Sequence, residues 1–588
     1  MSRLADRRLR LMLALSLAAF ATVVARAVQI QVVDASALSR KAVSQQRGVE
    51  ILPGWRGSIL SDDGQVLAQT QWAKTIVADP KQLKDPLREA VAIARAMGYH
   101  QFKAVKHHGG KKPKRHRRKL KPNPAWPAHV QAIADQLQKG GYGILRQLPL
   151  NVAQRITAKH LPGISTVKEL TRWYPFHALA PQVIGYTVDG AAGPGEGAGL
   201  EHQYNRVLAG KPGRQVYVRD PTGSTVLETV RLRRPVDGRD ITTTIDTMVQ
   251  AEVQAVLRQT VKASRAAWAT GIVLDPRTGA ILAMATAPGY DNNKVHDLPN
   301  LDTSHNNALE TTYEPGSTFK VVTFSAALSA GLIWPQETFA NLPYKLRFGD
   351  RTIHDDMPRG PVTLKAYQIL QKSSNIGTDT IAQIVGKHLL MHWIRAYGFG
   401  RHTGLGWPGE SAGIVLPGDK WTAPSIGTIP IGQGIGVTPM QMASMYQAIA
   451  NGGVMVQPRL VEKIGDRPVP PSPSHRVLSE PVDRQLVSML GTVVEDGGTG
   501  TKASICGYSV AGKTGTAQKP DGHGGYLSEY DASFVGFLPA SDPRVEVMVV
   551  VDSPHTSHFG GIVAAPAFEQ IGTWLANHLA IPPDEPCN

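Results

Sequence analysis

The chain has 588 residues, of which 42% are hydrophobic, and a formal net charge of +16. This length predicts two or three domains, with enough apolar residues to form real cores. Its two cysteines, Cys506 and Cys587, exclude a disulfide scaffold and a cysteine-ligated zinc or iron–sulfur site. Whether these two cysteines pair is left open by the sequence.

The N-terminus carries a membrane signal. A basic tail over residues 1–10 precedes an apolar run that begins at Leu11 and continues past Arg26 to Val33. This pattern predicts a single transmembrane anchor over 11–33, with the tail in the cytoplasm and the rest of the chain translocated. The alternative is a signal peptide cleaved near Ala25-Arg26-Ala27. We favour the anchor because apolar residues continue beyond that site.

Residues 34–237 are expected to form a first extracytoplasmic domain. The segments Arg56–Ile59 and Asp62–Gly64 predict a strand, a turn and a second strand. Within this domain, residues 103–124 are expected to form an exposed loop. From Lys103 to Lys121 the loop has ten lysines and arginines and no acid, so it cannot bury a core.

Two interpretations of the basic loop are possible. Its charge is suited to anionic lipid head groups or wall polymers, but a solvated insertion without a ligand is the interpretation we favour. Four nearby histidines suggest metal binding, which the surrounding cations disfavour: His100, His107, His108 and His116. Nucleic-acid binding is not expected of a segment beyond the membrane.

A second domain is expected over residues 238–580, followed by a short tail over 581–588. Its first part predicts a strand at 240–244, a helix at 248–261 and a hairpin formed by 270–275 and 280–285. Further strands are expected near 510–518, 532–538 and 545–551. The order of elements predicts an α+β fold with an antiparallel sheet flanked by helices. The sequence has no Gly-rich phosphate loop or dinucleotide fingerprint.

The stretch from Tyr313 to Lys320 holds the first candidate site. Pro315 and Gly316 can open a helix, and the apolar run 321–332 predicts that this helix is buried. Positions i and i+3 share a helix face, so Ser317 and Lys320 can come within hydrogen-bond reach. A serine needs a neighbouring base to become a nucleophile, and a desolvated lysine can be that base. Alone the pattern is weak, because Ser165-Thr166-Val167-Lys168 matches it too.

A second candidate motif follows about 56 residues later. Ser373-Ser374-Asn375 places a hydroxyl and an amide two positions apart, where both can point into a cleft from a loop. Ser373 could relay a proton between Lys320 and a leaving amine, and Asn375 could hold a substrate amide. Read alone, the motif is better explained as a helix N-cap.

A third motif, Lys513-Thr514-Gly515-Thr516, follows residues that predict an edge strand. Lys513 and Gly515 would share one face of this strand, and Thr514 and Thr516 the other. The cation and hydroxyls are suited to a carboxylate, and Gly515 would leave room for a peptide alongside the strand. The backbone N–H groups of Ser317 and Thr516 are candidates for an oxyanion hole.

The three motifs in this order are the signature of serine acyltransferases that bind penicillin. The chain resembles a class B penicillin-binding protein over nearly its whole length, and resembles the division type (FtsI-like) more than the elongation type. Further segments that carry the resemblance are Arg56-Gly57, Arg172-Trp173-Tyr174-Pro175, Gly199-Leu200-Glu201, Glu314-Pro315-Gly316 and 427–439. One departure is the turn Ser61-Asp62-Asp63-Gly64, where the family usually has Asp-Arg-Asn-Gly and where a salt bridge is expected to be missing.

The resemblance implies a penicillin-binding transpeptidase fold, which serine β-lactamases share, above an N-terminal pedestal or dimerisation domain. It implies D,D-transpeptidation of peptidoglycan, with Ser317 as the nucleophile, Lys320 as the base and Ser373 in proton return. Asn375 and Lys513 complete the catalytic set, and Thr514, Gly515 and Thr516 would bind the substrate carboxylate together with Lys513. No metal or organic cofactor is implied.

The resemblance also implies partners and a location. The substrates would be stem peptides of peptidoglycan and its lipid-linked precursor, with β-lactams as inhibitors. A membrane glycan polymerase of the FtsW type and other division proteins would bind the anchor and pedestal. The catalytic domain would lie in the periplasm, on a single-pass anchor in the cytoplasmic membrane.

Three alternatives stay open. An elongation-type transpeptidase would carry the same motifs. A membrane-anchored β-lactamase would carry them too, although the anchor and the pedestal of roughly 200 residues argue against a free hydrolase. A penicillin sensor or a scaffold with a vestigial site is disfavoured by the intact Ser317, Lys320, Ser373 and Lys513.

Overall fold

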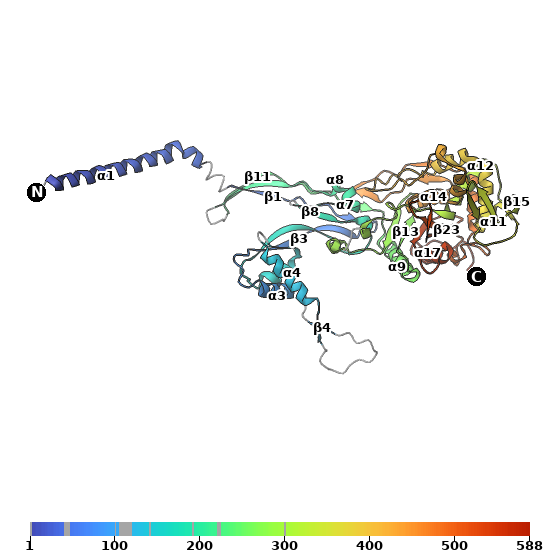
Figure 1. The fold of residues 1–588 in the computed structure, drawn as a ribbon, viewed down its shortest axis with the longest axis horizontal. Coiled ribbons are helices and arrows are strands. Elements are labelled where there is room, and N and C mark those ends of the chain that lie inside the picture. Colours follow the sequence, from blue (N-terminus) through green and yellow to red (C-terminus); the bar gives the residue numbers. More distant parts are fainter. Residues whose placement is uncertain are drawn as a thin grey trace. The chain divides into compact units, whose positions relative to one another are not determined.

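The computed structural model describes residues 3–39, 47–99, 102–104, 120–139, 143–190, 193–219, 225–298 and 302–587 (Figure 1). Most of the basic loop, residues 105–119, and the histidines His100, His107, His108 and His116 lie outside these residues. The chain forms two compact units. One contains residues 1–55 and 210–238, and the other contains residues 56–209 and 239–588.

The first unit begins with a long apolar helix. Helix α1 (Arg3–Val28) continues into a short π-helix, η1 (Gln29–Val33). By length and composition, residues Asp6–Val33 can cross a membrane, and no other helix among the described residues can; a signal sequence would pass the same test. The unit also contains an antiparallel sheet of β1 (Arg47–Leu52), β10 (Gly213–Arg219) and β11 (Thr225–Arg233).

The second unit is built around a five-stranded antiparallel sheet in the order β14-β13-β25-β24-β23. The strands are β13 (Trp268–Leu274), β14 (Ile281–Ala287), β23 (Ala511–Pro520), β24 (Tyr526–Leu538) and β25 (Val545–Asp552). All of these were expected from the sequence, including the hairpin of β13 and β14 and the edge position of β23. The α+β prediction is therefore confirmed.

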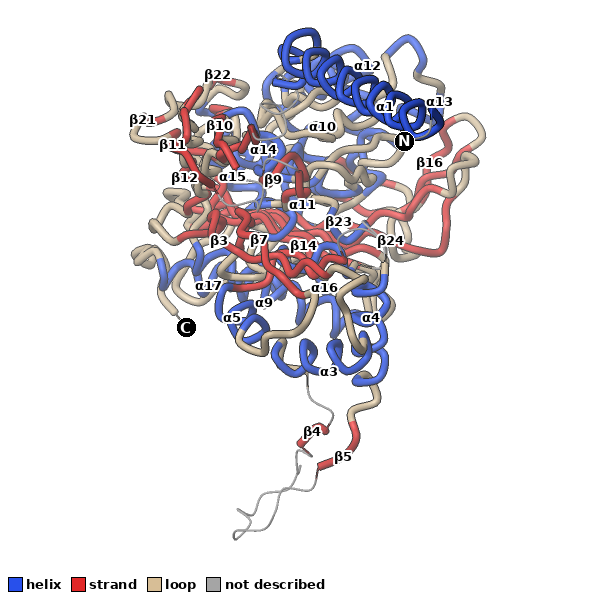
Figure 2. The backbone as a smooth tube through the Cα atoms, turned by 90° about the vertical axis from the view of Figure 1, so that its left-hand side faces the viewer, coloured by secondary structure: helices blue, strands red, loops and turns tan. Residues whose placement is uncertain are grey.

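Helices cover both faces of this sheet (Figure 2). On one face, α9 (Thr247–Ser264) and α17 (Ala565–His578) share a core with β13, β24 and β25. On the other face lie α10 (Lys320–Ser329), α12 (Asn375–Ala396), α14 (Pro439–Ala450) and α15 (Glu480–Gly491). Helix α9 begins at Asp246, whose carboxylate accepts the N–H groups of Met248 and Val249. Because both faces are covered, every residue of β25 is buried.

A second sheet in the same unit combines strands that are distant in sequence, in the order β21-β20-β12-β2-β3-β6, with β7 paired to β3. They are β2 (Ile59–Leu60), β3 (Val66–Ala78), β6 (Gly143–Pro149), β7 (Ile164–Trp173), β12 (Ile241–Thr243), β20 (Val461–Ile464) and β21 (Arg467–Pro468). Helices α3 (Pro86–Ala96), α4 (Trp126–Gln138) and α5 (Leu150–Thr157) form a small core against β3 and β6.

Three motif segments of the N-terminal region meet at a buried ion cluster. Arg56 and Arg172 donate to the two carboxylate oxygens of Glu201, at 2.7 and 2.6 Å, and all three side chains are almost fully buried. At the divergent turn, the Asp63 carboxylate instead accepts the hydroxyls of Ser61 and Thr247. The described residues show no ion pair at this turn.

The shorter elements of the second unit are β4 (Phe102–Ala104), β5 (Leu120–Pro122), α6 (Pro181–Ile184), β8 (Thr187–Gly190), β9 (Gly193–Gly197), α7 (Gly199–Gln203), α8 (Asn205–Leu208), η2 (Asn292–Asp297), η3 (Asp302–Ser304), η4 (Gly316–Phe319), β15 (Thr338–Leu342), β16 (Lys345–Phe348), β17 (Arg351–His354), β18 (Val362–Lys365), α11 (Ala366–Gln371), η5 (Gly418–Lys420), α13 (Ala423–Thr428), η6 (Ile429–Ile431), β19 (Val454–Val456), β22 (Ser474–Arg476), η7 (Thr501–Ala503) and α16 (Gly560–Val563). A disulfide joins Cys506 and Cys587, which answers the question that the sequence left open.

Candidate active site

Ser317 lies in the 3-10 turn η4, which leads directly into α10. Gly316 before it has a φ of +56° and donates its N–H to the Gly432 carbonyl at 3.0 Å. A side chain at Gly316 would collide with the Thr516 carbonyl, so glycine allows this turn to approach β23 closely. Ser317 is partly exposed, and its hydroxyl makes no hydrogen bond within the described part of the chain.

The amine of Lys320 is fully buried and holds the second motif. It donates to the Ser373 carbonyl, to the Ser373 hydroxyl at 3.1 Å and to the Asn375 side-chain oxygen at 2.7 Å. The spacing predicted that Ser317 and Lys320 would be within reach of each other, but the structure shows the Lys320 hydrogen bonds going to Ser373 and Asn375. The Ser317 hydroxyl and the positioned Lys320 amine thus come from residues three apart, where η4 leads into α10.

The environment of Lys320 makes its amine easier to deprotonate than that of a lysine in water. Burial lowers the pKa of Lys320 to about 8, against the opposing effect of the nearby carboxylates Asp356, Asp355 and Asp379. Asp379 lies one turn beyond Asn375 on α12 and is itself buried, and burial raises its pKa to about 8. Among the described residues its carboxyl oxygens have no hydrogen-bond partner.

The N-terminus of α12 positions the second motif. Ser374 is the N-cap, and its hydroxyl accepts the N–H of Gly377 at 3.0 Å. Ser373, in contrast, has a φ of +56°, so its backbone turns toward Lys320. The N-cap interpretation therefore holds for Ser374, while the side chains of Ser373 and Asn375 accept from the Lys320 amine.

Asp355, which no sequence motif marks, supports this helix end. Its carboxylate accepts the N–H groups of Asn375 at 2.7 Å and Ile376 at 3.1 Å, together with the Ser374 hydroxyl. Asn375 also donates to the His354 carbonyl at 2.9 Å. Asp355 has no motif around it, and only its support of a helix N-terminus, seen in three dimensions, reveals its role.

The third motif occupies the edge strand as predicted. Lys513 is fully buried, and its amine donates to the Thr514 carbonyl and hydroxyl at 3.1 and 3.2 Å. Burial, and then the charge of Lys320, hold the pKa of Lys513 well below its usual range. The Thr514 hydroxyl pairs with the Thr499 hydroxyl at 2.7 Å, and that of Thr516 accepts the Gly560 N–H at 3.2 Å.

The structure gives a different reason for Gly515 from the one expected. A Cβ at this position would lie 2.9 Å from the Pro315 carbonyl and would collide with the Ser533 hydroxyl. Glycine therefore makes room for the turn that carries Ser317, and room for a peptide along the strand stays a prediction.

A polar chain at the outer end of β23 was also missed. Glu314, three residues before Ser317, accepts the Gly434 N–H at 2.9 Å and the Tyr526 hydroxyl at 3.1 Å. Burial raises the pKa of Glu314. The Arg351 guanidinium lies 5.5 Å from the Tyr526 ring centre and donates to the Gly524 carbonyl at 3.1 Å.

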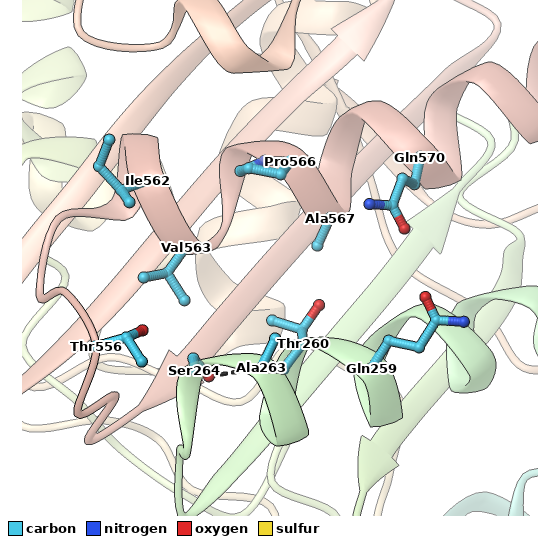
Figure 3. Close-up of a pocket in the computed structure, with 10 residues that line it drawn as sticks. All are labelled: Gln259, Thr260, Ala263, Ser264, Thr556, Ile562, Val563, Pro566, Ala567 and Gln570. Atoms are coloured by element: carbon cyan, nitrogen blue, oxygen red, sulfur yellow. Dashed lines mark hydrogen bonds between the residues drawn. The ribbon is translucent and has the colours of Figure 1, made fainter.

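Two other features lie away from this constellation. The second Ser-x-x-Lys sequence is on strand β7, where Lys168 lies 4.0 Å from the Trp72 ring centre, so Ser165 has no helical partner amine. A pocket between α9 and the α16–α17 segment is lined by residues such as Gln259, Thr260 and Val563 (Figure 3). None of the predicted site residues lines it.

Comparisons with known proteins agree with this geometry. Residues 269–572 match the family described as penicillin binding protein transpeptidase domain, and residues 51–243 match the penicillin-binding protein dimerisation domain. The chain is 33% identical to the penicillin-binding protein PbpB of Mycobacterium tuberculosis, over 94% of this chain and 82% of the relative. It is 30% identical to the peptidoglycan D,D-transpeptidase FtsI of Escherichia coli K12, over 97% of this chain and 91% of that protein.

A solved structure shows the same fold. The crystal structure of penicillin binding protein 3 from Mycobacterium tuberculosis, complexed with aztreonam, matches with a TM-score of 0.67 and 28% identity. The match covers 92% of this chain and 99% of that structure.

Proposed function

Since the chain belongs to the class B penicillin-binding proteins, the peptidoglycan D,D-transpeptidases, we propose that Ser317 is its acylated nucleophile and Lys320 its general base. The observation that carries these roles is the buried Lys320 amine, hydrogen-bonded to Ser373 and Asn375 one helical turn from a free serine hydroxyl. With a pKa of about 8, roughly a tenth of Lys320 is the free base at pH 7.

Acylation follows from this arrangement. Ser317 Oγ attacks the carbonyl of the penultimate D-alanine of a stem peptide while the Lys320 amine takes its proton. The new ester bond forms as the C–N bond to the terminal D-alanine breaks. The proton returns to the departing amine through Ser373, whose hydroxyl lies 3.1 Å from the Lys320 amine.

The substrate is held at the edge strand. Lys513, Thr514 and Thr516 bind the terminal carboxylate, and Gly515 keeps β23 close to the Ser317 turn. The N–H groups of Ser317 and Thr516 receive the negative charge that develops on the attacked carbonyl oxygen. Ser317 is suited to this because the first N–H groups of a helix have no partner within the helix.

A second stem peptide completes the reaction. Its amine attacks the ester carbonyl, the new amide cross-link forms, and Ser317 recovers its hydroxyl hydrogen. A β-lactam presents a strained amide in place of the D-alanine pair and leaves an ester on Ser317 that hydrolyses slowly.

We place the pedestal domain at residues 34–237 and the transpeptidase domain at 238–580, and the family matches at 51–243 and 269–572 support this division. The apolar helix over Asp6–Val33 supports a single-pass anchor with a cytoplasmic N-terminus. The disulfide supports a catalytic domain outside the cytosol, because disulfides persist in oxidising compartments. Similarity to FtsI supports a role in cell division, and we propose septal synthesis with an FtsW-type polymerase as partner.

The test is intact-mass spectrometry of the full chain in detergent after incubation with benzylpenicillin. We expect one adduct per chain, persisting for hours, on the wild type and none on Ser317→Ala. An adduct that clears within seconds while the drug is consumed would indicate a β-lactamase. A folded wild type without an adduct would leave only a scaffold.

A further inference from the structure

The guanidinium of Arg351 lies at the outer end of β23, next to Tyr526. Arg351 is partly buried at the start of β17, and within the described part of the chain no carboxylate lies at ion-pair distance from it. It donates to the Gly524 carbonyl and also interacts with the Tyr526 side chain. Glu314, the acid in this polar chain, is already engaged by Tyr526 and Gly434. Among the described residues, Arg351 thus has no direct ion pair, although its charge acts on Glu314 from a greater distance and partly offsets the rise that burial causes in the pKa of that carboxyl.

Arg351 belongs to the frame that positions the catalytic groups. Strand β17 runs from Arg351 to His354, whose carbonyl accepts the Asn375 amide at 2.9 Å. On the other side, Tyr526 links the guanidinium to Glu314 and so to the turn of Ser317. Arg351 therefore lies between the two segments that carry the catalytic side chains.

The direction of a bound donor follows from the third motif. The proposed carboxylate site is at the side chains of Lys513, Thr514 and Thr516, and the attacked carbonyl lies at the backbone N–H groups of Ser317 and Thr516. From carboxylate to carbonyl, the donor therefore runs along β23 toward Pro520. Pro520 is four residues beyond Thr516, about 13 Å at the strand rise, and is paired with Tyr526. The residues that precede the reacting D-alanine thus extend toward Tyr526 and Arg351.

We propose that Arg351 determines donor specificity by binding a carboxylate that the donor peptide carries two to four residues before the carbonyl attacked by Ser317. This rests on the function proposed above. Arginine is suited to the role because its planar guanidinium can bind a carboxylate through two N–H groups at once. Donors with an amide in place of that carboxylate react more slowly. The discrimination between acid and amide donors comes from Arg351, so no charged residue on β23 is needed for it.

The test uses the full chain in detergent and synthetic donors that end in a D-alanyl thioester of thioglycolate. Paired donors differ only by glutamate or glutamine at the second, third or fourth residue before the reacting carbonyl. The rate of thiol release gives kcat/KM, and the benzylpenicillin adduct counts active sites in every preparation. The variants are Arg351→Gln, Arg351→Lys and the control Arg347→Gln, an exposed arginine on the neighbouring strand β16.

We expect the wild type and Arg347→Gln to prefer glutamate over glutamine at least tenfold at one of the three positions. Arg351→Gln should reduce that preference to less than twofold, and Arg351→Lys should restore part of it. The preference should also weaken at high ionic strength. Persistence of the preference in Arg351→Gln overturns the inference. So does a wild type that forms the penicillin adduct yet reacts equally, or not at all, with both donors. A folded wild type without the adduct overturns the proposed function as well.

Discussion

At the scale of single residues, the proton on Lys320 sets the pH dependence of acylation. Only the free amine can accept the Ser317 proton, and its pKa is about 8. We therefore expect the rate of penicillin acylation to rise about tenfold per pH unit below pH 8 and to level off above it. Stopped-flow acylation from pH 5.5 to 9.5 measures this profile.

The matched variant is Lys320→Arg, which keeps the charge but cannot serve as a base near neutral pH. We expect its acylation rate to fall by about two to four orders of magnitude at every pH. A variant that retained the wild-type profile would show that another group takes the serine proton.

Glu546 is a buried acid that costs stability. It lies on the central strand β25, fully buried, and its carboxyl oxygens have no hydrogen-bond partner among the described residues. Burial raises its pKa well above the usual range. The folded protein thus binds this proton more tightly than the unfolded chain. The stability that comes from binding this proton is fully present below pH 4 and is lost as the pH rises.

We expect Glu546→Gln to raise the free energy of unfolding relative to the wild type by about 1–3 kcal/mol at pH 8 and by much less at pH 4. Denaturant unfolding at both pH values measures the difference. Glu495→Gln, at an exposed position, is the control and should change neither value. An equal gain at both pH values would show that ionisation of Glu546 is not the cause.

The sequence identified the candidate catalytic residues more readily than the residues that support them. Ser317, Lys320, Ser373, Asn375 and Lys513 became candidates because three short motifs occur in a fixed order. Asp355 and Arg351 were not found, since each is placed by backbone contacts with other segments of the chain. A hydrogen bond to a backbone group depends on fold geometry and leaves no residue pattern of its own.

At the scale of elements, the approach of η4 to β23 depends on glycine. A Cβ at Gly515 would meet the Pro315 carbonyl and the Ser533 hydroxyl. We expect Gly515→Ala to destabilise the fold by about 1–3 kcal/mol and to slow penicillin acylation at least tenfold, because the Ser317 turn must move away from the strand. Acylation kinetics and thermal melting measure the two effects.

Gly360→Ala is the control for that change, since open space surrounds Gly360 and its φ is not positive. It should leave acylation as in the wild type. Wild-type acylation by Gly515→Ala would show that the turn tolerates displacement.

The elements that the sequence predicted are the strongly patterned ones. The hairpin of β13 and β14, helix α9 and the strands β23 to β25 all appear where they were expected. The 3-10 turn before α10 was not predicted, because the apolar run that indicated the helix does not distinguish a 3-10 first turn from an α-helical one. The hairpin of β16 and β17, which carries Arg351, is also too short and polar to give a periodic signal.

At the scale of the whole molecule, the compact units interleave along the chain. Residues 56–209 group with the catalytic region because β2 pairs with β12 in parallel, and β12 pairs with β20. Sequence patterns assign domains to consecutive stretches of the chain. They therefore do not reveal pairing between strands as far apart as Ile59 and Ile241.

The disulfide should contribute measurably to stability. Cys506 and Cys587 are 81 residues apart, and closing a loop of this size restricts the unfolded chain. We expect reduction to lower the free energy of unfolding by about 2–4 kcal/mol. Thermal melting with and without reductant measures this. The double variant Cys506→Ser/Cys587→Ser should melt at the lower temperature and ignore the reductant. Equal melting of the oxidised and reduced wild type would contradict the prediction.

The same bond encloses a particular part of the protein. Between its two cysteines lie β23, β24, β25 and α17. This stretch contains the edge strand and the exposed turn over residues 521–525, which joins β23 to β24. These elements form one covalent ring. A protease that cuts the exposed turn therefore opens the ring without releasing either piece. In an oxidising compartment, a nicked molecule keeps its strands tethered side by side, and the damage becomes visible as two fragments only after reduction.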